Sequence, residues 1–186
     1  MSNARSQILQ TTRDLLEKQG YHGTGLNEIV KQSGAPKGSL YYYFPDGKEQ
    51  ITAEAVLQSG QVTAERIRDE LTSGSEAASA VHDFILRVAD HVEHSGFAAG
   101  SPLTAVAMET ATTSERINEA CRAAYSLLQN AFKKKLLESR YSASKADELA
   151  TFITASIEGG IILSRTYHTA DPLRRVAKQL KVLLSL

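Results

Sequence analysis

The chain has 186 residues, of which 42% are hydrophobic and 23% charged, and its 21 basic side chains balance its 21 acidic ones. Such a composition is typical of a globular protein with a core of its own and excludes a disordered or fibrous chain. No apolar run approaches the length of a membrane helix and no signal peptide is found, so we expect a cytoplasmic protein without a membrane partner. Because the net charge is zero, nucleic-acid binding must be argued from a local pattern.

Helical periodicity covers most of the chain and no alternating strand pattern is found, which predicts an all-α fold of about nine helices. The first four helices are expected at about residues 4–19, 25–33, 36–44 and 48–71. Gly20 and Gly34 are placed to end the first two helices, and Thr24 is placed to cap the second. The Pro-Asp-Gly run at 45–47 separates the third helix from the fourth.

The remaining helices are separated by clear start signals. Residues 73–76 and 112–115 each have the spacing of a capping box, and they are expected to open helices that reach about residues 94 and 140. A short helix is expected between them at about 103–111, after the Gly-Ser-Pro break at 100–102. Another helix is expected at about 144–167, and Asp171 is expected to cap the last one.

Residues 26–45 have the pattern of a helix-turn-helix, which is two short helices joined through a glycine. In the second helix, Leu40 and Phe44 lie four residues apart and are expected to face inward as anchors. The three tyrosines at 41–43 cannot all face inward as well. Their hydroxyl groups suit contacts with DNA phosphates. The alternative is a small helical subdomain whose core contains a tyrosine cluster.

The same segment resembles the DNA-binding domain of TetR-type transcriptional regulators over about residues 4–51. The resemblance is distributed over many positions and is therefore more specific than one short motif. It rests on Ile8, Leu15, Leu16, Gly20, Tyr21, Thr24, Ile29, Gly34, Lys37, Gly38, Ser39, Leu40, Tyr41, Tyr42, Tyr43, Phe44, Lys48 and Glu49. The chain departs from the family pattern at several points, such as Tyr43 where histidine is frequent, and these departures leave the operator sequence undefined.

The resemblance implies a three-helix DNA-binding domain at residues 1–63 and a larger helical domain for effector binding and dimerisation at residues 64–186. By position, it implies phosphate contacts from Thr24, Tyr41, Tyr42, Tyr43 and Lys48. It places three residues closest to the bases, namely Lys37, Gly38 and Ser39. Residues 1–50 carry only six basic against five acidic side chains, so one domain should bind DNA weakly. Affinity would come from a dimer on a near-palindromic operator in double-stranded DNA.

In proteins of this type the last two helices of each subunit form a four-helix bundle, so the resemblance implies a homodimer. The side chains expected at its interface are Phe152, Ser156, Gly160, Ser164, Val176, Leu180 and Leu183. From the helical pattern alone, ordinary packing within one chain is the alternative.

Regulators of this type also bind a small molecule among their middle helices, and we expect a repressor that an effector releases from its operator. The residues expected to line the effector pocket are Phe84, Arg87, His91, Phe97, Met108, Glu109, Tyr125, Phe132 and Phe152. A plain core role is the alternative for each of them. The run that begins at 100–102 resembles the LmrA/YxaF-like branch of the family, whose members are associated with aromatic or drug-like effectors.

No pattern for catalysis or for a bound cofactor is found. The glycine-rich phosphate loops and the nucleophile elbow are both missing, and the chain is not expected to be an enzyme. His91 and His94 lie three residues apart beside two carboxylates, but a polar helix face explains them better than a metal site. The rival interpretation is a helical, dimeric ligand-binding or adaptor protein whose helix-turn-helix has lost DNA binding.

Overall fold

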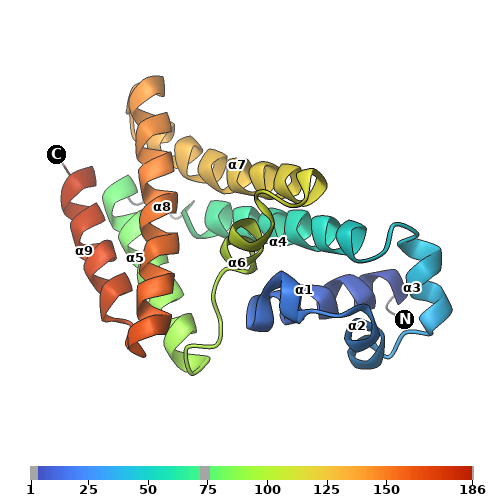
Figure 1. Ribbon diagram of the computed structural model, residues 1–186. Coiled ribbons are helices and arrows are strands. Elements are labelled where there is room, and N and C mark those ends of the chain that lie inside the picture. The colour runs from blue at the N-terminus through green and yellow to red at the C-terminus, as the bar shows by residue number, and fades with distance from the viewer. Residues whose placement is uncertain (1–3, 72–75, 186) are drawn as a thin grey trace. The chain divides into compact units, whose positions relative to one another are not determined.

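The computed structural model describes residues 4–71 and 76–185, and over these ranges it contains nine α-helices and no strand (Figure 1). The all-α fold expected from the periodicity is therefore confirmed. The helices are α1 (Ala4–Gly23), α2 (Leu26–Ser33), α3 (Lys37–Tyr43), α4 (Gly47–Leu71), α5 (Ala77–His94), α6 (Pro102–Thr110), α7 (Glu115–Glu138), α8 (Ala143–Tyr167) and α9 (Asp171–Leu184).

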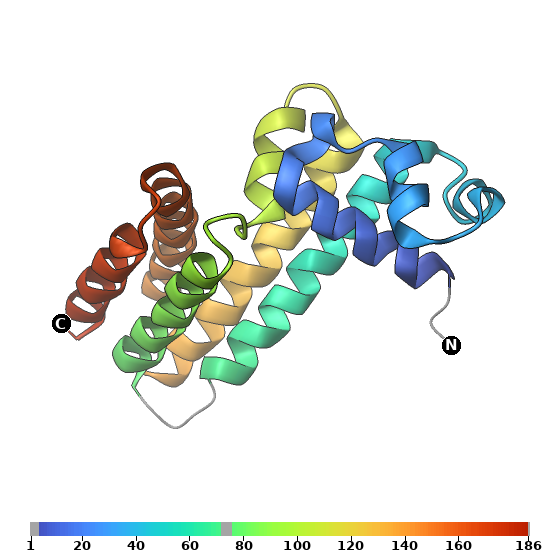
Figure 2. The same ribbon diagram turned by 90° about the horizontal axis from the view of Figure 1, so that it is seen from below.

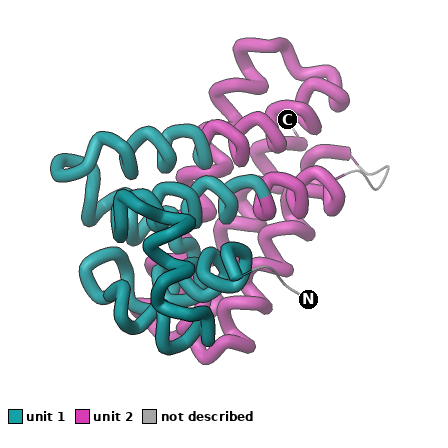
Figure 3. The backbone as a smooth tube through the Cα atoms, turned by 90° about the vertical axis from the view of Figure 1, so that its right-hand side faces the viewer, with its two compact units in different colours: residues 1–61, 101–125 teal, residues 62–100, 126–186 magenta. Residues whose placement is uncertain are grey.

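The chain forms two compact units, which Figure 3 shows in different colours. Unit 1 consists of Met1–Gln61 and Ser101–Tyr125, and unit 2 consists of Val62–Gly100 and Ser126–Leu186. Helices α4 and α7 each contribute their first part to unit 1 and the rest to unit 2. Unit 1 therefore combines α1 to α3 with α6, a grouping of distant segments that helical periodicity does not reveal.

In unit 1, α1 is the central helix and packs against α2, α3 and α6 (Figure 2). Its buried face carries side chains that recur every three to four residues, because this spacing keeps them on one side of a helix. Ile8, Leu15 and Leu16 are buried on this face as the pattern predicts. Thr12 is buried among them, and its hydroxyl donates to the carbonyl oxygen of Ile8 (2.8 Å), so its polar group is satisfied.

Gly20 and Gly34 of unit 1 both have positive φ, a left-handed backbone conformation that costs other residues about 1 kcal/mol or more. Gly20 has φ 70° and ends the regular part of α1 where the sequence predicts a stop, although one more turn continues to Gly23. Gly34 has φ 65° and ψ 6°, and it turns the chain from α2 towards α3.

The starts of α2 and α5 differ from the sequence-based expectation. Thr24 does not cap α2, because Gly25 occupies the capping position and the Thr24 hydroxyl donates to the carbonyl oxygen of Gly20 (2.7 Å). The capping box expected from residue 73 depends on residues outside the described ranges. Helix α5 begins at Ala77, and the side chain of its N-cap residue, Glu76, makes no capping hydrogen bond.

The starts of α7 and α9 are also shifted. Ser114 caps α7, because its hydroxyl accepts the backbone N–H of Ile117 (3.2 Å), and the box expected from Thr112 is therefore wrong by two residues. Asp171 is the first residue of α9, and Ala170 holds the capping position expected for it. Short polar side chains near a helix start compete for the same backbone N–H groups, so the sequence alone does not decide which of several adjacent residues caps the helix.

In unit 2, α5 packs against α8 and α9, and α9 also packs against α8 (Figure 1). A β-carbon at Gly160 would lie 2.8 Å from the side chain of Leu173, so glycine allows α9 to approach α8 closely. Ser164, one turn further along α8, is completely buried. These small residues serve packing within the chain, which corrects the expectation that Gly160 and Ser164 face a second subunit.

None of the helices in the described part of the chain has the length and apolar character that a membrane crossing requires.

Candidate nucleic-acid interface

The turn between α2 and α3 fixes the orientation of α3. Ala35 follows Gly34 and is buried, so it anchors the turn in the core. The Ala35 N–H donates to the hydroxyl of Ser33 (3.3 Å), and the Ser39 N–H donates to the carbonyl oxygen of Pro36 (2.9 Å). The turn is therefore held both by core packing and by local hydrogen bonds.

One face of α3 is attached to the rest of unit 1. Leu40 and Phe44 are completely buried, which confirms the prediction from their spacing. The Phe44 N–H donates to the carbonyl oxygen of Leu40 (2.8 Å) and closes the last turn. The guanidinium group of Arg5 lies 5.4 Å from the centre of the Phe44 ring, within cation–π range, and Arg5 also forms an ion pair with Glu54 of α4.

The other face of α3 is open to solvent. Tyr41 is 49% exposed and Tyr42 is 80% exposed, so the alternative of a tyrosine cluster in a core is wrong. Tyr43 is half-buried, and its ring meets that of Tyr42 edge-on with the centroids 5.0 Å apart. Lys37 and Gly38 are exposed at the start of the helix. A short exposed helix with a lysine and phenol hydroxyls carries the groups that bind phosphate oxygens and base edges.

Thr24 does not belong to this surface. Its side chain is completely buried, and its hydroxyl is engaged by the carbonyl oxygen of Gly20. The phosphate contact expected from Thr24 is therefore corrected, because a buried and hydrogen-bonded hydroxyl cannot reach DNA in this conformation. Ser39, expected near the bases, is half-buried in the first turn of α3.

Lys48, near the start of α4, lies against an aromatic ring. Its Nζ atom is 4.2 Å from the centre of the Tyr21 ring. Burial lowers the pKa of Lys48, and the negative charge of Glu109 acts in the opposite direction. Burial also raises the pKa of the Tyr21 hydroxyl, and Glu49 adds to this effect. Tyr21 was not among the residues predicted for this site, although its position directly after a glycine stop was an available signal.

The residues expected at a dimer interface differ in their exposure. Buried or half-buried within unit 2 are Ser156, Gly160, Ser164, Val176 and Leu180. Phe152 is 52% exposed and Leu183 is 39% exposed. Further apolar side chains on α8 and α9 are exposed but were not predicted at an interface, namely Ile162, Leu163, Tyr167 and Val182. We call Phe152, Leu183 and these four residues the α8–α9 apolar surface.

Within unit 2, the residues expected in an effector pocket are only partly brought together. Phe84 and Phe132 are both buried and meet edge-on, with the ring centroids 5.7 Å apart. The Phe97 ring has a different aromatic neighbour, His168, with the ring centroids 5.6 Å apart. His91 is exposed on α5.

Three further residues expected in the pocket lie in unit 1. Met108 is 77% exposed. The hydroxyl groups of Tyr125 and Thr104 lie 3.2 Å apart, within hydrogen-bond distance. The carboxylate of Glu109 accepts the backbone N–H of His22 (2.8 Å), so this side chain contacts α1.

Arg87, another expected pocket residue, takes part in an ion-pair cluster of unit 2. Its Nε atom donates to one carboxylate oxygen of Glu70 (2.6 Å), and Arg66 Nε donates to the other (2.6 Å). Burial alone would raise the pKa of Glu70, but the hydrogen bonds and charges of the two arginines outweigh it and hold this pKa below its usual value.

Glu70→Gln should reduce the free energy of unfolding by about 1 kcal/mol at neutral pH, because it leaves two arginines without their carboxylate. A lowered pKa in the folded state gives stability that is present above the unfolded pKa and is lost as pH falls through the folded one. Wild type and variant should therefore converge at pH values below the lowered folded pKa of Glu70, where its carboxyl group is protonated in both the folded and the unfolded state. Urea unfolding at several pH values measures this, with Glu65→Gln on the exposed side of α4 as the control. An equal difference at every pH would contradict the charge-based explanation.

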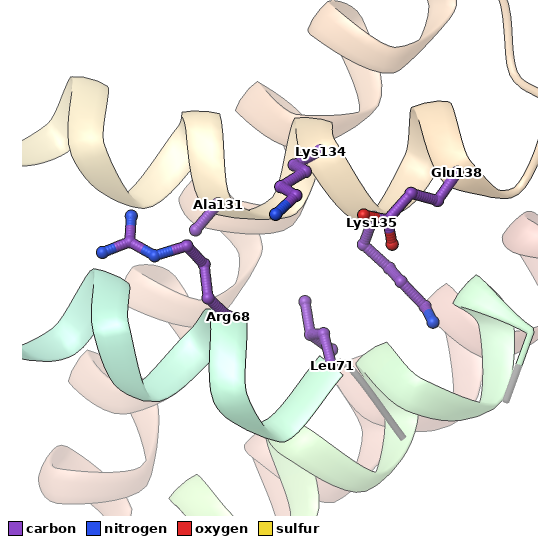
Figure 4. Close-up of a pocket in the computed structure, with 6 residues that line it drawn as sticks. All are labelled: Arg68, Leu71, Ala131, Lys134, Lys135 and Glu138. Carbon is purple, nitrogen blue, oxygen red and sulfur yellow. The ribbon is translucent and has the colours of Figure 1, made fainter. Parts of the chain in front are cut away.

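Figure 4 shows a hollow at the ends of α4 and α7 in unit 2. Its lining residues are Arg68, Leu71, Ala131, Lys134, Lys135 and Glu138. None of them belongs to the expected effector pocket. In Figure 4 the charged ends of Arg68 and Lys135 point in different directions, so they do not converge on one position where an anion could bind.

The histidines of α5 and Cys121 were also considered for other chemistry. Among the described residues, no group of three His, Cys, Asp or Glu side chains is placed to hold a metal ion. The Nδ1 atom of His94 lies 2.7 Å from the carbonyl oxygen of Asp90 within α5. Cys121 is 3% exposed, and burial raises the pKa of its thiol to about 11, so almost none of it is the reactive thiolate at neutral pH.

The buried anchors of α3, the left-handed turn and the exposed tyrosine face define a helix-turn-helix within an all-α chain. Two family profiles match the sequence. The one described as "Bacterial regulatory proteins, tetR family" covers residues 8–55, and the one described as "Transcriptional regulator LmrA/YxaF-like, C-terminal domain" covers residues 77–179. The chain belongs to the TetR family of transcriptional regulators and to its LmrA/YxaF-like branch, and it is a regulator and not an enzyme.

Known proteins agree with this assignment. YxaF of Bacillus subtilis, an uncharacterized HTH-type transcriptional regulator, is 39% identical over 182 residues, which are 98% of this chain and 95% of YxaF. The HTH-type transcriptional regulator LmrA of the same organism is 38% identical over 182 residues, which are 98% of this chain and 97% of LmrA. The crystal structure of a regulatory protein TetR from Rhodobacter sphaeroides has the same fold, with a TM-score of 0.85 at 22% identity over 97% of this chain and 98% of that one.

Proposed function

We propose that the protein is a homodimeric repressor that binds a near-palindromic operator in double-stranded DNA and leaves it when a small aromatic or drug-like effector binds. The observation that carries the DNA-binding part is the exposed face of α3, supported from behind by Leu40 and Phe44. In this proposal the bases are read by Lys37, Gly38 and Ser39. The phosphates are bound by Tyr41, Tyr42, Tyr43 and Lys48. Residues 1–63 form the DNA-binding domain, and a regulator of this kind acts in the cytoplasm, where the DNA is.

The α8–α9 apolar surface supports the homodimer. Large exposed apolar side chains that gather on neighbouring helices mark an interaction surface rather than a solvated one. A two-fold dimer uses the same patch on both subunits, so this surface would be buried against its own copy. Two recognition helices would then lie in successive major grooves, which is how a regulator with little basic excess gains affinity. In this proposal residues 64–186 carry both dimerisation and effector binding.

Fewer observations support the effector-binding part of the proposal. The buried pair Phe84 and Phe132 provides aromatic surface in unit 2, and aromatic side chains favour aromatic ligands. An effector that binds the conformation without DNA better than the DNA-binding conformation would shift the protein away from its operator.

A structural relative supports the DNA-binding part of the proposal. The regulator CifR, with 20% identity and a TM-score of 0.79, is described in complex with 26bp double-strand operator DNA.

The DNA-binding proposal predicts two classes of variant. Tyr41→Ala and Lys48→Ala should weaken binding to all sequences, and Lys48→Ala should also reduce the salt slope by about one phosphate contact. Lys37→Ala or Ser39→Ala should relax the sequence preference, at a cost of about 1–3 kcal/mol per lost base contact. Fluorescence anisotropy with DNA from upstream of the protein's own gene and a random duplex, at two salt concentrations, measures both effects.

Lys178→Ala is a matched control, because it removes an exposed lysine from α9, far along the chain from the helix-turn-helix. Full operator affinity in the Tyr41→Ala protein would count against the proposed docking of α3. If the wild type binds both duplexes weakly and equally, a binding-site selection from random DNA decides whether the operator lies elsewhere. No salt-dependent binding to any selected DNA would favour the adaptor protein with a non-functional helix-turn-helix.

A further inference from the structure

Glu109 of α6 makes a specific contact with the end of α1. Its Oε2 atom accepts the backbone N–H of His22 at 2.8 Å, within unit 1. Its Oε1 atom lies so close to Gly20 that a β-carbon there would be only 2.1 Å away. The carboxylate therefore lies directly over the turn at residues 20–22, and the absence of a side chain at Gly20 is what allows this approach.

The same turn carries Tyr21, whose ring lies 4.2 Å from the Nζ atom of Lys48. The turn is thus contacted by Glu109 from α6 and by Lys48 from α4. The negative charge of Glu109 acts to raise the pKa of Lys48, against the larger effect of burial. A residue expected in the effector pocket and a residue expected at the DNA phosphates therefore belong to one cluster.

We propose that Glu109 is a positioning residue for Lys48. By accepting the His22 N–H it holds the turn at residues 20–22, and with it the Tyr21 ring, in the orientation that directs the lysine towards a DNA phosphate. This inference rests on the proposed function of Lys48 as a phosphate contact.

Glu109 would strengthen phosphate binding because it preorganises the Lys48 side chain. A lysine has a long flexible side chain, and fixing it on binding costs rotamer entropy. A ring that already restricts the side chain removes part of this cost before DNA arrives. The ring itself must be held, and the backbone next to Gly20 is intrinsically flexible because glycine has no side chain. The hydrogen bond from the His22 N–H to Glu109 adds a restraint from α6 to the local bonds that Thr24 makes with the carbonyl oxygens of Gly20 and Tyr21.

The test compares three substitutions of Glu109 on a duplex obtained by selection from random DNA with the wild-type protein. Glu109→Ala removes the hydrogen bond and should weaken binding about tenfold, with a salt slope reduced by about one phosphate contact. Glu109→Asp keeps the charge but shortens the side chain, and it should show the same loss to a smaller extent. Glu109→Gln keeps an oxygen that can accept the His22 N–H and should bind as the wild type does. Glu119→Ala removes an exposed carboxylate of α7 and controls for net charge.

A double-mutant cycle separates positioning of Lys48 from a general effect on folding. In the Lys48→Ala background, Glu109→Ala should leave the salt slope unchanged, because the phosphate contact is already lost. Wild-type affinity and slope in both Glu109→Ala and Glu109→Asp would overturn the inference, and so would tighter binding, which would make Glu109 a competitor of the phosphate. An equal slope change in both backgrounds would also overturn it. If Glu109→Ala does not fold, Glu109→Asp decides. A wild-type protein without salt-dependent DNA binding would overturn the proposed function itself, and this inference with it.

Discussion

The double substitution Phe152→Glu and Leu183→Glu is expected to convert the protein into a monomer and to weaken operator binding by at least about 100-fold. Both side chains belong to the α8–α9 apolar surface, which is exposed in the single chain. In a two-fold interface each substitution occurs twice, so four carboxylates would have to be buried against apolar neighbours. An uncompensated buried charge costs about 3–5 kcal/mol, and four of them together match or exceed the roughly 12 kcal/mol that holds a nanomolar dimer.

Sedimentation velocity measures the result, because the mass should fall from about twice 20.2 kDa to that of one chain. Leu137→Glu is the matched control, since Leu137 is 44% exposed on α7 and lies outside the surface. Circular dichroism should show unchanged helix content in both proteins. A double variant that remains a dimer would show that the subunits associate through another surface.

Phe44→Ala should have the largest effect on the fold of the DNA-binding segment. The side chain is completely buried and lies under the Arg5 guanidinium, so its truncation leaves a cavity beneath α3. The loss in free energy of unfolding should be about 3–5 kcal/mol. Because α3 is only seven residues long, it cannot persist without this anchor, and operator binding should be lost together with stability.

Tyr42→Ala is the comparison variant for Phe44→Ala. Tyr42 lies two residues earlier on the same helix and is 80% exposed, so its truncation should change the free energy of unfolding by less than about 0.5 kcal/mol. It should still weaken DNA binding. Urea unfolding and anisotropy on the two proteins therefore separate the anchoring face of α3 from its binding face. Similar stability losses in both variants would contradict the assignment of these faces.

The sequence was sufficient for features that depend on local periodicity. The spacing of Leu40 and Phe44 predicts which face of α3 is buried, and the glycines at 20 and 34 predict where the chain turns. Family resemblance was also carried by residues of this local segment. These predictions succeed because a helix places its side chains by a fixed angle, whatever lies beyond it.

Features that depend on contacts between distant segments could not be predicted in this way. Thr24 has the residue type of a helix cap and of a phosphate ligand, but its hydroxyl is buried against the carbonyl of Gly20. Glu109 and His22 are 87 positions apart in the sequence, and only the packing of α6 on α1 brings them together. On α8, the small residue Gly160 lies on the face towards α9, and a helix with apolar residues on two sides does not reveal which side a neighbour covers.

The burial of Cys121 makes the native protein suitable for site-directed labelling. Its thiol is the only one in the chain, and with a pKa of about 11 it remains protonated at neutral pH. A maleimide dye or spin label should therefore react only with a cysteine introduced at an exposed position, without prior removal of the natural one. In the proposed dimer, one such label near α3 on each subunit would report the distance between the two recognition helices in solution, with and without a candidate effector.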